Sequence, residues 1–298
     1  MTIARWSPGA VDKGAARRYN AGVNRLGPLP DRDRMSVLVG TLVLGLALMR
    51  LIDLPDRFVH TTVLGSPLGI QVSTTTVMLA LITALAATGM ESLARSHPNF
   101  TNGRRFDLRS LVHAIQPALA VLLLGAQLAQ AQPWTAWWLG LGITAILTAL
   151  VLAAEYMTVD PAQRQGALGL AMTALNLLLA LASFTLIYST RARSFLTATE
   201  ASVVAGLLAL RLLWGMGQPL RQALIYAGAI GLALGECLWA LNYWRATPLL
   251  AGLLLVLIYY AMTGIAQQHE RGALDRRVLA EFGLVALVGL VIILRFAR

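Results

Sequence analysis

Charged residues are scarce in this chain, since only 13% of its 298 residues are Asp, Glu, Lys or Arg. A soluble domain typically has about 25% charged and 45–50% apolar residues. Here 57% of the residues are hydrophobic, and they form blocks of roughly 17–25 residues, the length that crosses a hydrocarbon core as a helix. The alternating segments of about ten residues that are typical of membrane β-barrels do not occur. The composition therefore predicts an all-α, polytopic membrane protein.

Cysteine and histidine are also scarce. Cys237 is the single cysteine, which excludes an intrachain disulfide and a cysteine-based metal cluster. No two of the four histidines lie three to five residues apart, so there is no local zinc-binding spacing. The sequence also lacks a nucleophile elbow, a His-Glu-x-x-His motif, paired intramembrane aspartates and a phosphate-binding loop. It therefore identifies no catalytic residue, no metal site and no cofactor.

Lysine is almost absent, Lys13 being the only one, yet the net charge is +10 because 24 basic residues outnumber 14 acidic ones. In a soluble protein this balance would suggest binding to nucleic acid. Here the arginines lie mainly between the apolar blocks, where basic residues orient helices in a membrane. We therefore expect the lipid bilayer as partner, with other membrane-protein subunits as further candidates, and no nucleic acid.

Nine apolar segments are predicted to span the membrane: 35–54, 73–94, 111–131, 134–154, 165–189, 196–216, 222–243, 247–266 and 278–296. A cytoplasmic N-terminus places 16 basic residues on the cytoplasmic side and 7 outside, as the positive-inside rule requires. We therefore expect a multi-pass protein of the cytoplasmic membrane with an external C-terminus. The ninth segment is open to a second interpretation, an interfacial helix, because Arg295 and Arg298 would have to be translocated.

Two regions flank or interrupt the predicted bundle of residues 35–298. Residues 1–34 are basic, contain scattered Gly and Pro and lack an apolar stripe, which predicts a mobile cytoplasmic tail. Residues 57–73 contain two runs rich in Val, Ile and Thr that flank Gly65-Ser66-Pro67, a turn signal. This pattern predicts a small external β-hairpin or flap over the outer ends of the helices.

Three motifs resemble those of one family: TVLGSPLGIQVS (Thr62–Ser73), AATGMESLARSHP (Ala86–Pro98) and GECLWALNYW (Gly235–Trp244). They are similar to segments of uncharacterised multi-spanning membrane proteins found mainly in Chloroflexota-type bacteria. The resemblance covers most of the chain in topology and about 35 residues as recognisable motif. It implies a membrane protein and no particular reaction, substrate or cofactor.

Glu236 interrupts the seventh apolar segment. A charged side chain near the centre of a membrane costs at least ~2.5–3.5 kcal/mol, so such residues usually face the interior of a bundle. Small residues share its helical face, and Ala227, Gly231 and Gly235 form an adjacent stripe that permits close helix packing. We therefore expect Glu236 to be buried between helices.

Asn176 in the fifth segment and Tyr259 in the eighth fall at a depth similar to that of Glu236 when each helix rises 1.5 Å per residue. They are the predicted hydrogen-bond partners of Glu236. Two interpretations of the carboxyl group remain open. It is either a buried, protonated group that ties three helices together, or a relay for protons or cations.

Arg211 lies within the sixth apolar segment, towards its cytoplasmic end. One interpretation is that its guanidinium group reaches back to the cytoplasmic surface along its own side chain. The other is an ion pair with Glu155 at the cytoplasmic end of the fourth segment. Counting residues along the helices places Arg211 and Glu236 more than roughly 10 Å apart in depth, which argues against a direct pair.

A set of polar residues on the cytoplasmic side is predicted to converge. Its side chains are of the types that bind phosphate groups or a hydrolytic metal ion, although they come from several loops at irregular spacing. The set contains Glu91, Arg95, His97, His113, Gln116, Glu155 and His269.

Three functions follow from these observations. The first is an accessory, scaffold or assembly component of the cytoplasmic membrane, favoured by the few polar residues within the spans and the lack of reaction motifs. The second is a small proton-coupled transporter that uses Glu236. The third is a membrane enzyme that acts on lipid-linked substrates through the cytoplasmic polar set. The sequence favours the first, which is not an enzyme.

Overall fold

The computed structural model describes residues 31–52, 57–63, 66–98, 108–160, 164, 166–215, 217, 219–244 and 246–296. Its helices are α2 (Arg32–Leu51), α3 (Thr74–Arg95), α4 (Leu108–Ala129), α5 (Trp134–Met157), α6 (Ala167–Ser189), α7 (Ser194–Gly215), α8 (Leu220–Leu241), α9 (Pro248–Glu270) and α10 (Arg276–Phe296). Eight of the described helices, α2 to α9, are long and apolar enough to cross a membrane. The first eight predicted spans each coincide with one of them.

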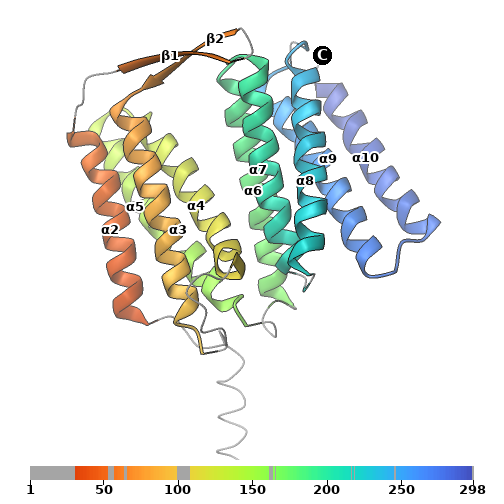
Figure 1. Ribbon diagram of the computed structural model, residues 1–298, viewed down its shortest axis with the longest axis horizontal. Coiled ribbons are helices and arrows are strands. Elements are labelled where there is room, and N and C mark those ends of the chain that lie inside the picture. Colours follow the sequence, from red (N-terminus) through yellow and green to blue (C-terminus); the bar gives the residue numbers. More distant parts are fainter. Residues whose placement is uncertain are drawn as a thin grey trace, which may run out of the picture.

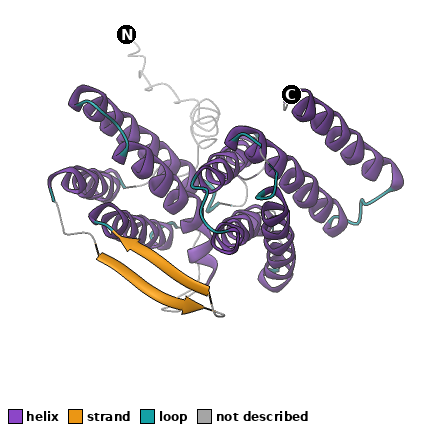
Figure 2. Ribbon diagram, turned by 90° about the horizontal axis from the view of Figure 1, so that it is seen from above, coloured by secondary structure: helices purple, strands orange, loops and turns teal. Residues whose placement is uncertain are grey.

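The long helices lie side by side, and two groups can be followed from above (Figures 1 and 2). One buried apolar cluster joins α2, α3, α4 and α5, and a second joins α4, α6, α7, α8 and α9 with Val151 of α5. Helix α4 belongs to both clusters and is the most buried of the eight, with 67% of its span enclosed. The centre of the bundle is therefore α4, and side chains that α4 presents inward lie far from lipid.

Strands β1 (Arg57–Val63) and β2 (Ser66–Val72) form an antiparallel pair across the ends of the helices (Figure 1). The register runs from Arg57 opposite Val72 to Val63 opposite Ser66. This is the antiparallel pair expected from the two runs rich in Val, Ile and Thr, although Ser66 and Pro67, which were predicted in the turn, are the first residues of β2. Its position on the outer side of the membrane depends on the orientation of the chain and stays a prediction.

The predicted N-terminal tail lies outside the described residues except for its last four. Three of these four belong to the first helix, α2, which begins at Arg32, and the fourth, Asp31, is its N-cap: the Asp31 side chain accepts a hydrogen bond from the Asp33 backbone N–H. The first helix therefore begins before the predicted tail boundary at residue 34, and it ends earlier than the first predicted span, at Leu51.

Helix α10 coincides with the ninth predicted span but is not among the eight helices that are apolar enough to cross. Its first turns carry Arg276, Arg277 and Glu281, and its last turn carries Arg295. It packs on α9, where a Cβ atom built on Gly264 would lie 2.3 Å from the ring of Phe282. Whether α10 spans or lies at the interface stays a prediction.

Helices α7 and α8 approach one another very closely. A Cβ atom built on Gly231 would lie 2.5 Å from the backbone oxygen of Ser202, and one built on Gly235 would lie 2.8 Å from that of Ala198. Only glycine permits this separation of the two backbones at these positions. The small-residue stripe predicted on α8 is thus the face that packs against α7.

Candidate functional site

Glu236 is exposed, so the prediction that it is buried between helices is wrong. The preceding residue, Gly235, packs against α7. Successive residues of a helix point about 100° apart, so Glu236 points away from this contact. The alanines on the helical face of Glu236, at positions 229 and 240, are exposed as well. Small residues lie on both sides of α8, and only the stripe that includes Gly235 packs against a neighbour.

Asn176 and Tyr259, the predicted partners of Glu236, bond to one another instead. The Tyr259 hydroxyl donates to Asn176 Oδ1 at 2.7 Å, and Asn176 Nδ2 donates to the backbone oxygen of Leu208 at 3.0 Å. Both side chains are fully buried. The role expected of Glu236, a polar group that ties three helices together, therefore belongs to Asn176, which joins α6, α7 and α9.

We expect Tyr259→Phe to lower the free energy of unfolding by about 0.6–1.7 kcal/mol, which are the average and the largest values measured for hydrogen bonds between membrane helices. The substitution leaves Asn176 Oδ1 without its donor. Unfolding of the purified protein in mixed micelles measures the change. Tyr260→Phe on the same helix is the matched control, because Tyr260 is 39% exposed. Equal losses in the two variants would contradict the role given to this bond.

Arg211 forms a two-pronged ion pair with Glu155. Its Nε donates to Glu155 Oε1 at 2.7 Å, and its Nη2 donates to Oε2 at 2.6 Å. Arg211 is 5% exposed and Glu155 is 0% exposed. The interpretation that Arg211 reaches the surface is therefore wrong, and the alternative pair with Glu155 is present.

Two further side chains complete what we call the buried ion cluster, which consists of Glu155, Arg211, His113 and Thr158. His113 Nδ1 lies 3.1 Å from Glu155 Oε2. The Thr158 hydroxyl lies 3.0 Å from the same oxygen and accepts a hydrogen bond from Arg211 Nη2 at 2.9 Å. Buried charges are tolerated when they are paired and hydrogen-bonded, and here Glu155 and Arg211 are paired with each other and bonded to Thr158, while Nη1 of Arg211 lies beside Gly215. The cluster links α4, α5 and α7.

Other members of the cytoplasmic polar set lie apart from this cluster. Arg95 pairs with Glu91 one turn earlier on α3, and Ser110 Oγ donates to Glu91 at 3.2 Å. Among the residues that the structure describes, no group of three His, Cys, Asp or Glu side chains is placed to hold a metal ion. The convergent site predicted from the sequence is therefore limited to His113, Glu155 and the neighbouring Gln116.

His97 and His269 likewise pack against separate aromatic rings. The centroid of the His97 ring lies 4.8 Å from that of Tyr156, and that of His269 lies 6.3 Å from that of Tyr226. Burial lowers the pKa of His97 from its usual value, while the carboxylate of Asp160 opposes the change. The imidazole of His97 thus lies edge-on to the Tyr156 ring at the loop that follows α3.

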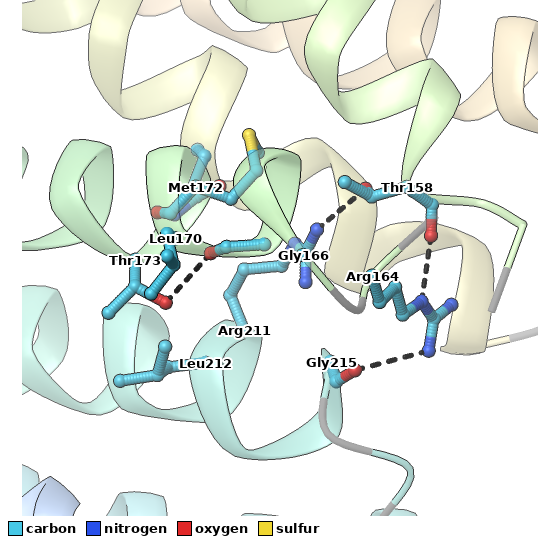
Figure 3. A pocket seen from close by; sticks show the side chains of 11 residues that line it. Thr158, Arg164, Gly166, Leu170, Met172, Thr173, Arg211, Leu212 and Gly215 are labelled. Carbon is cyan, nitrogen blue, oxygen red and sulfur yellow. Dashed lines mark hydrogen bonds between the residues drawn. The ribbon is translucent and has the colours of Figure 1, made fainter. Parts of the chain in front are cut away.

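A cavity of about 200 Å³ borders the buried ion cluster (Figure 3). Thr158 lies between two guanidinium groups at its edge: its hydroxyl accepts from Arg211, and its backbone oxygen accepts from Arg164 Nε at 2.7 Å. The cavity is lined by Gln116, Thr158, Arg164, Gly166, Gly169, Leu170, Met172, Thr173, Arg211, Leu212 and Gly215.

The sequence did not identify Arg164 as part of a site. Arg164 Nη1 donates to the backbone oxygen of Gly215 at 3.4 Å, and its guanidinium carbon lies 4.9 Å from the centre of the Trp214 ring. Burial lowers the pKa of Arg164, although a guanidinium group stays protonated in proteins. In the sequence Arg164 is one more loop arginine, and only the fold brings it to its partners at the ends of α5 and α7.

A second, larger cavity of about 690 Å³ lies between α4, α5 and α6. Its walls are mostly leucines, and Gln127, Gln130 and Ser189 lie among them. Neither this cavity nor the one beside the buried ion cluster is lined by Glu236.

Comparison with known proteins adds a family and no function. The model of a family described as protein of unknown function (DUF5656) matches residues 54–296. No curated protein matches the chain, and no solved structure matches it. An uncharacterised family is what the motif resemblance implied, and the bacterial distribution inferred from that resemblance stays a prediction.

Proposed function

We propose that this chain, which belongs to the family described as protein of unknown function (DUF5656), is an accessory component of an assembly in the cytoplasmic membrane. In this proposal α8 docks a transmembrane helix of a partner subunit, and that helix carries an arginine or a lysine at the depth of Glu236. The exposed carboxylate of Glu236 on an otherwise apolar helix face is the observation that supports it.

The exposed residues of α8 follow one side of the helix. Ile225, Ala229, Leu232, Glu236 and Trp239 are exposed, and their spacing of three or four residues places them in a single stripe. We call this set the α8 stripe. Ile225 is 60% exposed, Leu232 68% and Trp239 44%. Apolar side chains at these positions suit contact with lipid or with another helix, whereas a carboxylate suits only a polar partner.

The depth of Glu236 along α8 makes an unpaired carboxylate unfavourable. It lies five residues before the end of α8 at Leu241, about 8 Å at 1.5 Å per residue. A charge inside the hydrocarbon is unfavourable by at least ~2.5–3.5 kcal/mol at the helix centre. Within the described part of the chain, Glu236 forms no hydrogen bond or ion pair. A cation supplied by another helix would offset this cost.

A second copy of the chain is unsuited to bind at the α8 stripe. A two-fold axis along the membrane normal would place both Glu236 carboxylates at the same depth and opposite each other. Like charges at such a contact are unfavourable. A different subunit with a basic residue is complementary instead, and with the N-terminus in the cytoplasm the contact lies in the outer half of the membrane.

The other two functions are less well supported by the geometry. A proton-coupled transporter that relies on Glu236 needs this carboxyl inside the bundle or in a cavity, and it is exposed and lines neither cavity described above. An enzyme that relies on the cytoplasmic polar set needs those side chains to converge, and Glu91, His97 and His269 have separate partners.

Photo-crosslinking in native membranes tests the docking proposal. We expect a photo-reactive residue at position 232 to give an adduct with one other membrane protein, and the same residue at Ile146, 63% exposed on α5, to give none. Glu236→Arg should reduce the adduct by about tenfold or more, the effect of losing a charged hydrogen bond. Replacing the basic residue at the cross-linked site of the partner by Glu should restore it.

Glu236→Arg is also expected to leave the melting temperature of the purified protein unchanged, since the side chain is exposed. An adduct with lipid alone, an adduct with a second copy of the chain, or an adduct that Glu236→Arg leaves intact would each overturn the proposal.

A further inference from the structure

We infer that the cavity beside the buried ion cluster binds a phosphate anion together with a hydroxyl group, which is the P–OH group of hydrogen phosphate or a glycerol hydroxyl of a phosphoglycerol headgroup. This inference rests on the cavity between α4, α6 and α7 and is independent of the partner proposed for the α8 stripe. Three features of the cavity wall lead to it: two guanidinium groups, the first turn of α6, and a buried amide oxygen.

The two arginines give the cavity its positive side. Glu155 engages Nε and Nη2 of Arg211, and a Cβ atom built on Gly215, a lining residue, would lie 2.6 Å from the third nitrogen, Nη1. Arg164 bonds to the backbone oxygens of Thr158 and Gly215, which are neutral acceptors. Planar guanidinium groups match the oxygens of phosphate, so two of them at one cavity favour this anion.

The two acidic residues nearby, Glu155 and Asp160, do not line the cavity. Glu155 is not a lining residue, and its oxygens accept bonds from Arg211, His113 and Thr158. Asp160 acts on Arg164 electrostatically and does not line the cavity. An anion in the cavity therefore meets the guanidinium groups before either carboxylate.

The first turn of α6 adds backbone donors to the same wall. Gly166 precedes the helix and gives it no side-chain cap, and Gly166, Gly169 and Leu170 all line the cavity. The first N–H groups of a helix have no partner within the helix, and they carry the positive end of its dipole. A Cβ atom on Gly169 would lie 2.0 Å from the backbone oxygen of Arg164, so glycine lets this turn approach the Arg164 segment.

Gln116 selects for a hydroxyl on the anion. The side chain is 2% exposed, and its Nε2 donates to the backbone oxygen of Met172 at 3.4 Å. Its Oε1 is buried and has no hydrogen-bond partner among the described residues. A buried acceptor without a donor is destabilising. A ligand that offers both anionic oxygens and one O–H group satisfies the arginines and Gln116 together, whereas sulfate offers no proton.

The size and depth of the cavity suit such a ligand. Its volume of about 200 Å³ is much larger than the ~10–15 Å³ that one water needs on this measure. It lies where α5 ends, α6 begins and α7 ends, at one boundary of the bundle. Dissolved phosphates and lipid headgroups are both present at that depth, so the experiment must distinguish them.

Thermal unfolding of the purified protein tests the inference. We expect the melting temperature to rise with sodium phosphate, by mass action on the folded state, and to rise less with sodium sulfate at equal ionic strength. Arg164→Gln should weaken the apparent affinity for phosphate by about tenfold or more. Arg221→Gln, which removes an exposed arginine at the start of α8, is the matched control and should behave as the wild type does.

Two further variants separate the ligand from a general effect of charge. Gln116→Leu should abolish the preference for phosphate over sulfate, because it removes the acceptor. Arg164→Lys keeps the charge and loses the planar fork, so it should bind with intermediate strength, and it replaces Arg164→Gln if that variant does not fold. Equal stabilisation of the wild type by phosphate and sulfate, or a phosphate response that Arg164→Gln leaves unchanged, would overturn the inference; a wild type that responds to neither salt is resolved by the lipid arm of the next experiment.

The source of the phosphate is decided by three ligands tested in parallel: sodium phosphate, glycerol 1-phosphate, and nanodiscs that contain phosphatidylglycerol in place of phosphatidylcholine. Stabilisation by the soluble ligands that depends on Arg164 identifies a dissolved phosphate. Stabilisation by phosphatidylglycerol alone that depends on Arg164 identifies a lipid headgroup. A response to none of the three overturns the inference, and it leaves the docking proposal for α8 untouched.

Discussion

Glu155→Leu is expected to lower the free energy of unfolding by about 3–5 kcal/mol, the cost of leaving one member of a buried ion pair without its partner. Arg211 is 5% exposed and makes its charged hydrogen bonds to Glu155. In Glu155→Leu its guanidinium group stays buried without a counter-charge. Unfolding in mixed micelles, followed by loss of helical circular dichroism, measures this change.

The double variant Glu155→Leu with Arg211→Leu provides the control. Replacing both members of a buried pair by apolar residues is often neutral or even stabilising, so this variant should recover most of the loss. Glu236→Leu should change the stability little, since the side chain is exposed. A double variant as unstable as Glu155→Leu would show that the pair itself is not the cause.

Gly231→Ala is expected to destabilise the protein by about 1–3 kcal/mol, the usual cost of overpacking. Its new methyl group would lie 2.5 Å from the backbone oxygen of Ser202 and 3.2 Å from the backbone of Gly206. Backbone atoms cannot rotate away as a side chain can, so α7 and α8 must separate. The same unfolding measurement in mixed micelles tests it.

Gly228→Ala is the matched control on the same helix. A Cβ atom on Gly228 meets nothing within 4 Å, and alanine is a better helix former than glycine by about 1 kcal/mol. Gly228→Ala should therefore be neutral or stabilising. Equal effects of the two substitutions would mean that the close approach of α7 and α8 does not limit the stability of the bundle.

The helices and the hairpin could be predicted from the sequence because they depend on local properties. An apolar segment of about 20 residues forms a helix that can cross a membrane whatever its neighbours are, and eight described helices fit this pattern. The hairpin follows from β-branched runs on either side of a turn. For the ninth segment the sequence left two interpretations open, a span or an interfacial helix, because charged residues flank its apolar middle. Helix α10 has the same distribution of charged and apolar residues.

The depth of polar groups could also be predicted, since each residue adds about 1.5 Å along a helix. Asn176 and Tyr259 were expected at one level and are hydrogen-bonded at 2.7 Å. Glu155 and Arg211 were expected near the same end and form the ion pair that was one of the two interpretations of Arg211. Counting along a helix thus predicts which groups can meet.

Which groups do meet was decided only by the tertiary structure. The direction in which Glu236 points depends on which side of α8 packs against α7, and small residues occur on both sides of the helix. The cavity depends on Gln116, Arg164 and Arg211, which come from three distant parts of the chain. Hydrophobicity and helical rise fix where a residue lies along its own helix, because they act within one segment. The rotation of each helix about its axis is set by packing against the others, so the partners of Glu155 and the exposure of Glu236 follow from contacts between segments.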